Sequence, residues 1–142
     1  KETIKGKNVK LGFGGLADIE FGVQVLQLIH GKKFTRLRKT NTLSALQNFV
    51  ALGLVDQDMA TELQVSYLFL RNLECALRII RQTPTNTLPK DNKELASLAR
   101  LLGYKGEVTE TLAGALLADY ESYTQQVRKH YRKIIGNLLR AH

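Results

Sequence analysis

The stretch that decides the fold runs over residues 109–140 and reads TETLAGALLADYESYTQQVRKHYRKIIGNLLR. Apolar and aromatic residues recur in it at steps of three or four positions, which is the spacing of one side of an α-helix. These positions are Leu112, Leu116, Tyr120, Tyr123, Val127, Tyr131, Ile134 and Leu138. Thr109 opens the stretch, and Glu110 suits its first turn because a carboxylate there interacts favourably with the helix dipole. The stretch therefore predicts one long helix that packs along a partner helix.

Four further helices are predicted upstream, because apolar residues recur at helical spacing between glycines, prolines and capping residues. They extend over about residues 16–30, 43–52, 57–82 and 92–102. Asn41 or Thr42 can cap the second of them, and Asp56 can cap the third. Strand-like alternation is absent after Phe13. The predicted fold class is therefore all-α, an antiparallel bundle of about five helices.

The helix predicted at residues 16–30 carries apolar side chains on two sides. Ile19 and Val23 lie on one side, and Phe21, Val25 and Leu28 lie on another. Apolar groups on two sides predict a helix in the middle of the bundle.

The segment before this helix has a different character. Lysines alternate with single apolar residues up to Phe13, and Gly12, Gly14 and Gly15 then interrupt regular structure. We expect residues 1–15 to form an extended arm, either a short strand that pairs with a missing neighbouring domain or a loose segment. Residues 16–142 are expected to form the helical bundle domain.

The glycines at 12–15 invite comparison with phosphate-binding loops. They are not followed by Gly-Lys-Ser/Thr, and Ala17 stands where a G-x-G-x-x-G motif needs glycine. Glycines just before a helix can nevertheless leave free backbone N–H groups that bind an anion. The alternative is a tight turn without a ligand, and the sequence leaves both interpretations open.

The sequence offers no catalytic residue and no metal ligand set. Asp18 and Glu20 stand two positions apart on a helix, so their side chains point about 200° apart and cannot easily chelate one metal. The three histidines, His30, His130 and His142, lack the spacing of a zinc site. Spacing suggests no nucleophile–base set either.

The positive charge of the chain is concentrated at its two ends. Residues 1–39 hold nine Lys or Arg residues and three acidic residues, and residues 128–142 hold five Lys or Arg residues and no acidic residue. The middle, residues 40–127, holds seven Lys or Arg residues and ten acidic residues. Such ends can meet nucleic acid, a phosphate-bearing ligand or an acidic protein surface. The last cluster can also be a solvated face that matches the helix dipole. No apolar run approaches the length of about 20 residues that spans a bilayer, so no membrane partner is expected.

The single cysteine excludes an internal disulfide framework. Cys75 lies among apolar residues in a predicted helix, so we expect it to be buried in the core. A reducing, cytoplasmic location agrees with this usage.

Two stretches carry a family resemblance. Residues 10–21 read KLGFGGLADIEF and residues 27–31 read QLIHG. They resemble a signature of the bifunctional glutamine synthetase adenylyltransferases, whose usual form is Lys-Leu-x-x-Gly-Gly-x-x-Asp/Glu-Ile-Glu-Phe. The resemblance continues through residues 67–71, 87–89 and 102–104 and covers most of the chain. It departs at Cys75, where family members often have His, and in a longer loop before Leu88.

In that family each half of a long chain has a nucleotidyltransferase domain followed by a helical domain. The catalytic Gly-Ser and Asp-x-Asp elements lie upstream, and here only Asp56-Gln57-Asp58 has that spacing, where it caps a helix. The resemblance implies a non-catalytic regulatory and connecting domain that binds no cofactor itself. The full-length enzyme would use ATP and Mg²⁺. Its partners would be its own nucleotidyltransferase domains, glutamine synthetase and the signalling protein PII.

We expect the junction to the nucleotidyltransferase domain at Lys10, Gly14, Gly15, Asp18 and Glu20, close to the bound phosphates. Asp18 or Glu20 would pair with a basic group across it. Two alternatives remain: an independent basic helical module that binds nucleic acid, and the helical domain of a PII uridylyltransferase. The former is disfavoured because no reading helix accompanies the charge.

Overall fold

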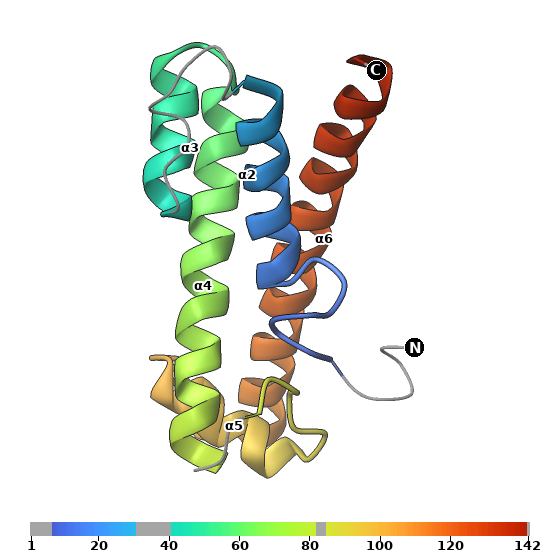
Figure 1. Ribbon diagram of the computed structural model, residues 1–142. Coiled ribbons are helices and arrows are strands. Elements are labelled where there is room, and N and C mark those ends of the chain that lie inside the picture. The colour runs from blue at the N-terminus through green and yellow to red at the C-terminus, as the bar shows by residue number, and fades with distance from the viewer. Residues whose placement is uncertain (1–6, 31–40, 82–84, 142) are drawn as a thin grey trace.

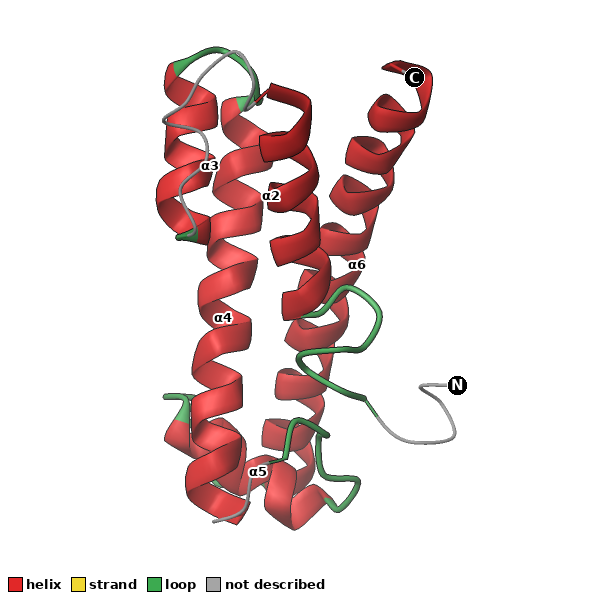
Figure 2. Ribbon diagram, viewed as in Figure 1, coloured by secondary structure: helices red, strands yellow, loops and turns green. Residues whose placement is uncertain are grey.

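The computed structural model describes residues 7–30, 41–81 and 85–141. These residues form the helices α2 (Leu16–His30), α3 (Thr42–Ala51), α4 (Gln57–Arg81), α5 (Asn92–Leu101) and α6 (Thr109–Ala141). No strand occurs in the described ranges, which contain a single isolated bridge between Asn8 and Thr87 (Figure 2). The prediction of an all-α bundle is confirmed. Residues 1–6 of the expected arm, 31–40, 82–84 and 142 lie outside the described part.

The two long helices, α4 and α6, run in opposite directions through the length of the molecule (Figure 1). α2 lies beside α6, α3 lies on the far side of α4, and the short α5 packs at the lower end against α6. Tyr104, which follows α5, donates its hydroxyl hydrogen to Asp119 of α6. Burial, together with that carboxylate, raises the pKa of Tyr104 above its ordinary range.

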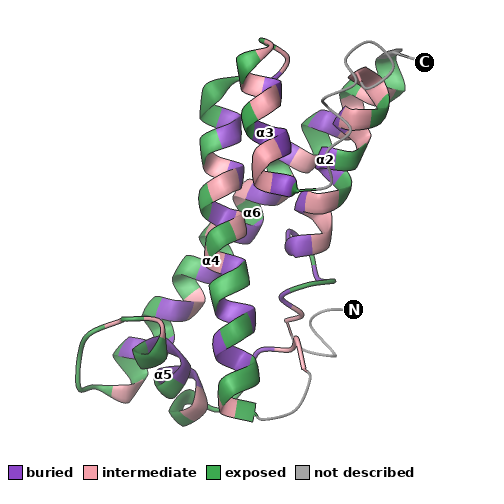
Figure 3. Cartoon of the chain, turned by 60° about the vertical axis from the view of Figure 1, so that its left-hand side comes forward, coloured by how far each residue is buried: buried purple, intermediate pink, exposed green. Residues whose placement is uncertain are grey.

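The seam predicted on the last helix packs against the bundle. Leu112, Leu116, Tyr120, Val127 and Ile134 are buried, and the other three seam residues are half-buried. α6 contacts α4, whose Leu70, Leu73 and Leu77 are buried in the same core. Leu46 and Phe49 of α3 belong to this core from the other side of α4. Figure 3 shows how buried and exposed residues alternate along the helices. After Ile134 no described residue of α6 is buried.

The predicted caps explain several helix ends. The Asn41 side chain accepts a hydrogen bond from the Ser44 N–H at 3.0 Å, so Asn41 is the cap of α3. Gly53, with φ +69°, follows this helix in the left-handed conformation that glycine adopts without strain. Asp56 precedes α4 as predicted, and its carboxylate accepts from the Asp58 N–H at 3.4 Å.

The prediction that α2 is surrounded by protein is wrong for this chain. Phe21 is 54% exposed and Leu28 is 79% exposed, whereas Ile19 and Val23 are buried. Within the described part, α2 contacts α3, α4 and α6 on its other sides. Phe21 and Leu28 of its second apolar stripe therefore face solvent, whereas Val25 of that stripe is half-buried and packs against the core.

The predicted burial of Cys75 is also wrong, because its thiol is exposed. Leu73 and Leu77 on the same helix are fully buried. Each stands two positions from Cys75, so the cysteine points about 200° away from them, toward solvent.

Candidate domain-junction site

The segment from Lys7 to Gly15 is a compact turn rather than the expected strand. The Asn8 side chain accepts hydrogen bonds from the N–H groups of Lys10 and Leu11, at 3.0 and 2.7 Å. The Val9 N–H donates to the Asn86 carbonyl at 2.7 Å, and Val9 is fully buried. The described residues 7–15 are therefore neither the strand nor the loose segment that the sequence predicted, because the turn satisfies its own backbone and is bonded to the loop before α5.

Gly14 and Gly15 are required by close packing within this turn. Gly14 has φ +71°, and a Cβ there would lie 1.9 Å from the Thr124 carbonyl oxygen of α6. A Cβ on Gly15 would lie 2.5 Å from the Val9 carbonyl oxygen. Both contacts are to backbone atoms, so neither position can take a side chain without movement of the turn.

The first N–H groups of α2 are all used within the chain. Gly14 donates to Asp18 Oδ2 at 2.8 Å and Gly15 donates to the Gly12 carbonyl at 3.0 Å. Leu16 donates to the Val9 carbonyl at 3.0 Å and Ala17 donates to the Lys10 carbonyl at 2.8 Å. Of the two interpretations that the sequence leaves open, the tight turn describes this segment, and these N–H groups are not free to bind an anion.

Asp18 joins the turn to α6. Its Oδ2 accepts from the Gly14 N–H and also from Arg128 Nη1 at 3.2 Å. The Arg128 guanidinium lies 4.6 Å from the Phe13 ring centroid and 5.2 Å from that of Tyr131. Such stacking of a guanidinium on aromatic rings is favourable. The ion pair of Asp18 is therefore internal to the chain.

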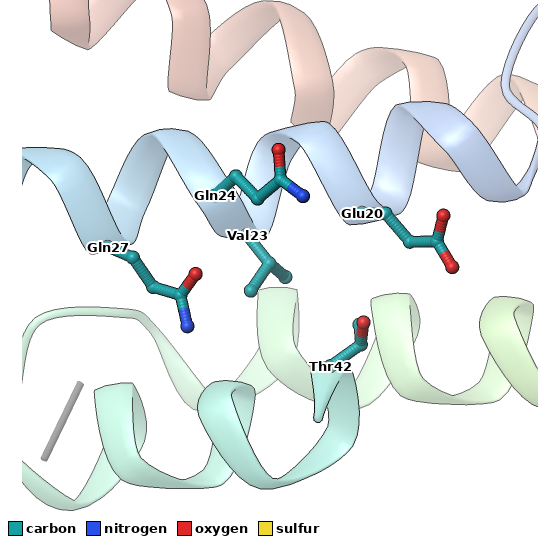
Figure 4. A pocket seen from close by; sticks show the side chains of 5 residues that line it. All are labelled: Glu20, Val23, Gln24, Gln27 and Thr42. Atoms are coloured by element: carbon teal, nitrogen blue, oxygen red, sulfur yellow. The ribbon is translucent and has the colours of Figure 1, made fainter. Parts of the chain in front are cut away.

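Glu20 points in a different direction, as the helix geometry predicted. It lines a hollow of about 280 Å³ with Val23, Gln24, Gln27 and Thr42. Figure 4 shows that four of these side chains come from α2 and that Thr42 comes from the start of α3. Within the described residues Glu20 has no ion-pair partner. Lys10, the remaining predicted junction residue, is exposed.

Three contacts of this region were missed from the sequence. Arg128 pairs with Asp18 and stacks on Phe13. Glu62 Oε1 lies 2.5 Å from His130 Nε2, and this contact joins α4 to α6. Each joins residues far apart in the chain, so local spacing carries no signal for it. The one local signal for the stacking on Phe13 is the position of this aromatic residue between two glycines.

The described residues contain no group of three or more His, Cys, Asp or Glu side chains that could hold a metal ion. Among the described helices, none is long and apolar enough to cross a membrane.

Comparison with known proteins finds one matching family and several similar proteins. Residues 1–135 match the family described as GlnD PII-uridylyltransferase. The chain is 36% identical, over 95% of its length, to the bifunctional glutamine synthetase adenylyltransferase/adenylyl-removing enzyme of Bartonella quintana. It is 38% identical to the proteins of that name from Mesorhizobium japonicum and Streptomyces coelicolor, over 96% and 93% of its length. The chain spans 13–14% of the length of these relatives.

Proposed function

This chain belongs to the family described as GlnD PII-uridylyltransferase, and we propose that it is the helical regulatory and connecting domain of a glutamine synthetase adenylyltransferase. The parent enzyme would transfer AMP from ATP to a tyrosine of glutamine synthetase and would remove it by phosphorolysis, in the cytoplasm. ATP and Mg²⁺ would bind to a nucleotidyltransferase domain that precedes this one. The chain itself would supply no catalytic group.

The observation that carries this proposal is the extent of the likeness. Identity of 36–38% extends over 93–96% of the chain, and each of these relatives carries the adenylyltransferase name. The likeness covers a small part of each relative, which agrees with one domain of a larger enzyme.

The exposed side of α2 supports a junction with another domain. Phe21 and Leu28 are seven positions apart and so lie on one face of the helix, where both are more than half exposed. Exposed apolar side chains that share a face are typical of interaction surfaces. We place the nucleotidyltransferase domain on this face, with the turn at residues 7–15 leading into it.

Within this junction the two acids take different roles. Asp18 already pairs with Arg128, so its part is to hold the turn against α6. Glu20 has no such partner in the described residues, so it is the acid that would pair with a basic group of the neighbouring domain. Gly14 and Gly15 permit the close packing of the turn, because neither has a side chain. Lys10 is exposed and could contact the neighbouring domain or the phosphates bound to it.

The test is the transfer of AMP. The full reading frame that encodes this chain, expressed and incubated with ATP, Mg²⁺ and glutamine synthetase, should attach AMP to a tyrosine of the synthetase. The isolated 142-residue chain should attach none. A full-length protein that transfers no AMP, or an isolated chain that transfers it robustly, would contradict the proposal.

The family description favours one second candidate, the helical domain of a PII uridylyltransferase. The two functions differ in nucleotide and target. In the same assay a uridylyltransferase would attach UMP from UTP to PII and leave glutamine synthetase unmodified.

A further inference from the structure

The second half of α6 carries a cationic face made of Lys129, Arg132, Lys133 and Arg140, all of them exposed. We infer that this cationic face is a docking surface for an acidic, partly apolar surface of a partner protein. Building on the proposed function, that partner is glutamine synthetase, and the face would hold the target while the neighbouring domain modifies it.

The helix dipole does not account for this face. α6 extends to Ala141, and Arg140 is the basic residue of its last turn. Lys133 lies about two turns before that end, and Lys129 and Arg132 lie further away. The interaction of cations with the dipole falls off within the last turn. Three of the four cations therefore need another explanation.

Pairing within the chain does not account for it either. Residues 128–142 contain no acid, and the acids of α6, namely Glu110, Asp119 and Glu121, all lie in its first half. In the described part of the chain, Arg128 is the one Lys or Arg of this half of α6 that pairs with a carboxylate, that of Asp18, and His130 contacts Glu62 on the side that faces α4. Lys129 and Lys133 are four positions apart, so their like charges destabilise the helix. Carboxylates of a partner would relieve this repulsion.

Apolar groups within the face favour a protein partner over nucleic acid. The Arg132 guanidinium lies 5.6 Å from the centroid of the Phe13 ring, which is 44% exposed. Leu139, seven positions after Arg132 and therefore on the same side of the helix, is 72% exposed. Arginine and aromatic anchors with apolar neighbours are typical of protein interfaces. Binding to a phosphate backbone needs the charge alone.

The place of the face suits the proposed reaction. Phe13 belongs to the turn at residues 7–15, which we place at the junction with the nucleotidyltransferase domain, and Arg132 lies over it. A target docked on the face would therefore lie next to that junction. Binding there would position the target through contacts outside the catalytic domain.

The experiment compares two double charge reversals that change the net charge equally. K129E/K133E alters the cationic face, and K90E/K93E alters two exposed lysines at the opposite end of the molecule. Circular dichroism first establishes that both chains remain helical. Binding of purified glutamine synthetase to the immobilised 142-residue chain is then measured at about 0.05 and 0.5 M NaCl, between which screening strengthens.

We expect K129E/K133E to weaken binding at low salt by about tenfold or more, and K90E/K93E to change it less than about twofold. Wild-type affinity should fall at high salt toward that of K129E/K133E. Equal effects of the two double variants, or no binding by the wild-type chain at low salt, would overturn the inference. The inference would also be overturned if the chain bound duplex DNA more tightly than glutamine synthetase and lost that binding in K129E/K133E. The cationic face would then be a nucleic-acid-binding surface.

The full-length enzyme separates this inference from the proposed function. In it K129E/K133E should raise the KM for glutamine synthetase by about tenfold and leave kcat within about twofold. An enzyme that transfers AMP with the same KM in wild type and K129E/K133E contradicts the docking face alone. A wild-type enzyme that transfers no AMP contradicts the proposed function.

Discussion

Asp18 and Arg128 lie 110 positions apart in the chain, and the Asp18 carboxylate accepts a hydrogen bond from the Arg128 guanidinium at 3.2 Å. The same carboxylate oxygen also accepts from the Gly14 N–H. One side chain therefore closes the turn at residues 7–15 and fastens it to α6. Because both side chains are partly buried, this contact contributes more than an exposed surface ion pair would.

Replacement of Asp18 by Ala should lower the free energy of unfolding by about 1–3 kcal/mol, because the Gly14 N–H and the Arg128 guanidinium lose their acceptor. Urea denaturation of the 142-residue chain measures this loss. Asp18→Asn retains an oxygen that can accept from Gly14 and should cost less. If both variants are as stable as the wild type, the contact does not stabilise the turn.

Replacement of Gly14 by Ala should be more damaging than the same change at another glycine with positive φ. The added Cβ would lie 1.9 Å from the Thr124 carbonyl oxygen, whereas a Cβ on Gly53 meets nothing within 4 Å. Gly53→Ala therefore costs the backbone strain alone, about 1–2 kcal/mol. Gly14→Ala adds displacement of the turn and should cost about 3 kcal/mol or more. Equal melting temperatures of the two variants would contradict this packing.

Replacement of Glu20 by Ala should lower the activity of the full-length enzyme without lowering the stability of the bundle. Glu20 has no ion pair in the described residues, so the stability of the 142-residue chain should change by less than about 0.5 kcal/mol. In the full-length enzyme the change should reduce AMP transfer by about tenfold, because the basic group proposed across the junction loses its acidic partner. Gln24→Ala, on the same hollow, serves as the control and should keep its activity. If the Glu20 variant keeps full activity, Glu20 does not contribute to the proposed junction.

The thiol of Cys75 should react in the folded chain. It is exposed on α4, so Ellman's reagent should modify one equivalent without denaturant. Cys75→Ser should change stability by less than about 0.5 kcal/mol, as expected for an exposed position. A thiol that reacts only after urea is added would place Cys75 in the core.

The sequence by itself determined the helices, because their signals are local. A spacing of three and four residues places Leu112, Leu116 and Tyr120 on one side of a helix wherever that helix packs. Asn41 caps α3 through a hydrogen bond to a residue three positions away. The family signature is equally local, since it is carried by consecutive residues. Neither the helices nor the signature needs a contact between distant parts of the chain.

Only the tertiary structure decided which groups remain available for function. Asp18 and Glu20 stand two positions apart and look equivalent in sequence, yet Arg128 of a distant helix pairs with Asp18 alone. Phe21 and Leu28 have the spacing of core residues, but no described helix covers them. The sequence left open whether the N–H groups before α2 are free, and in the structure they are bonded within a turn that packs against Thr124. Each outcome depends on which distant segment of the chain packs against the residue, and the local spacing of residues carries no information about such contacts.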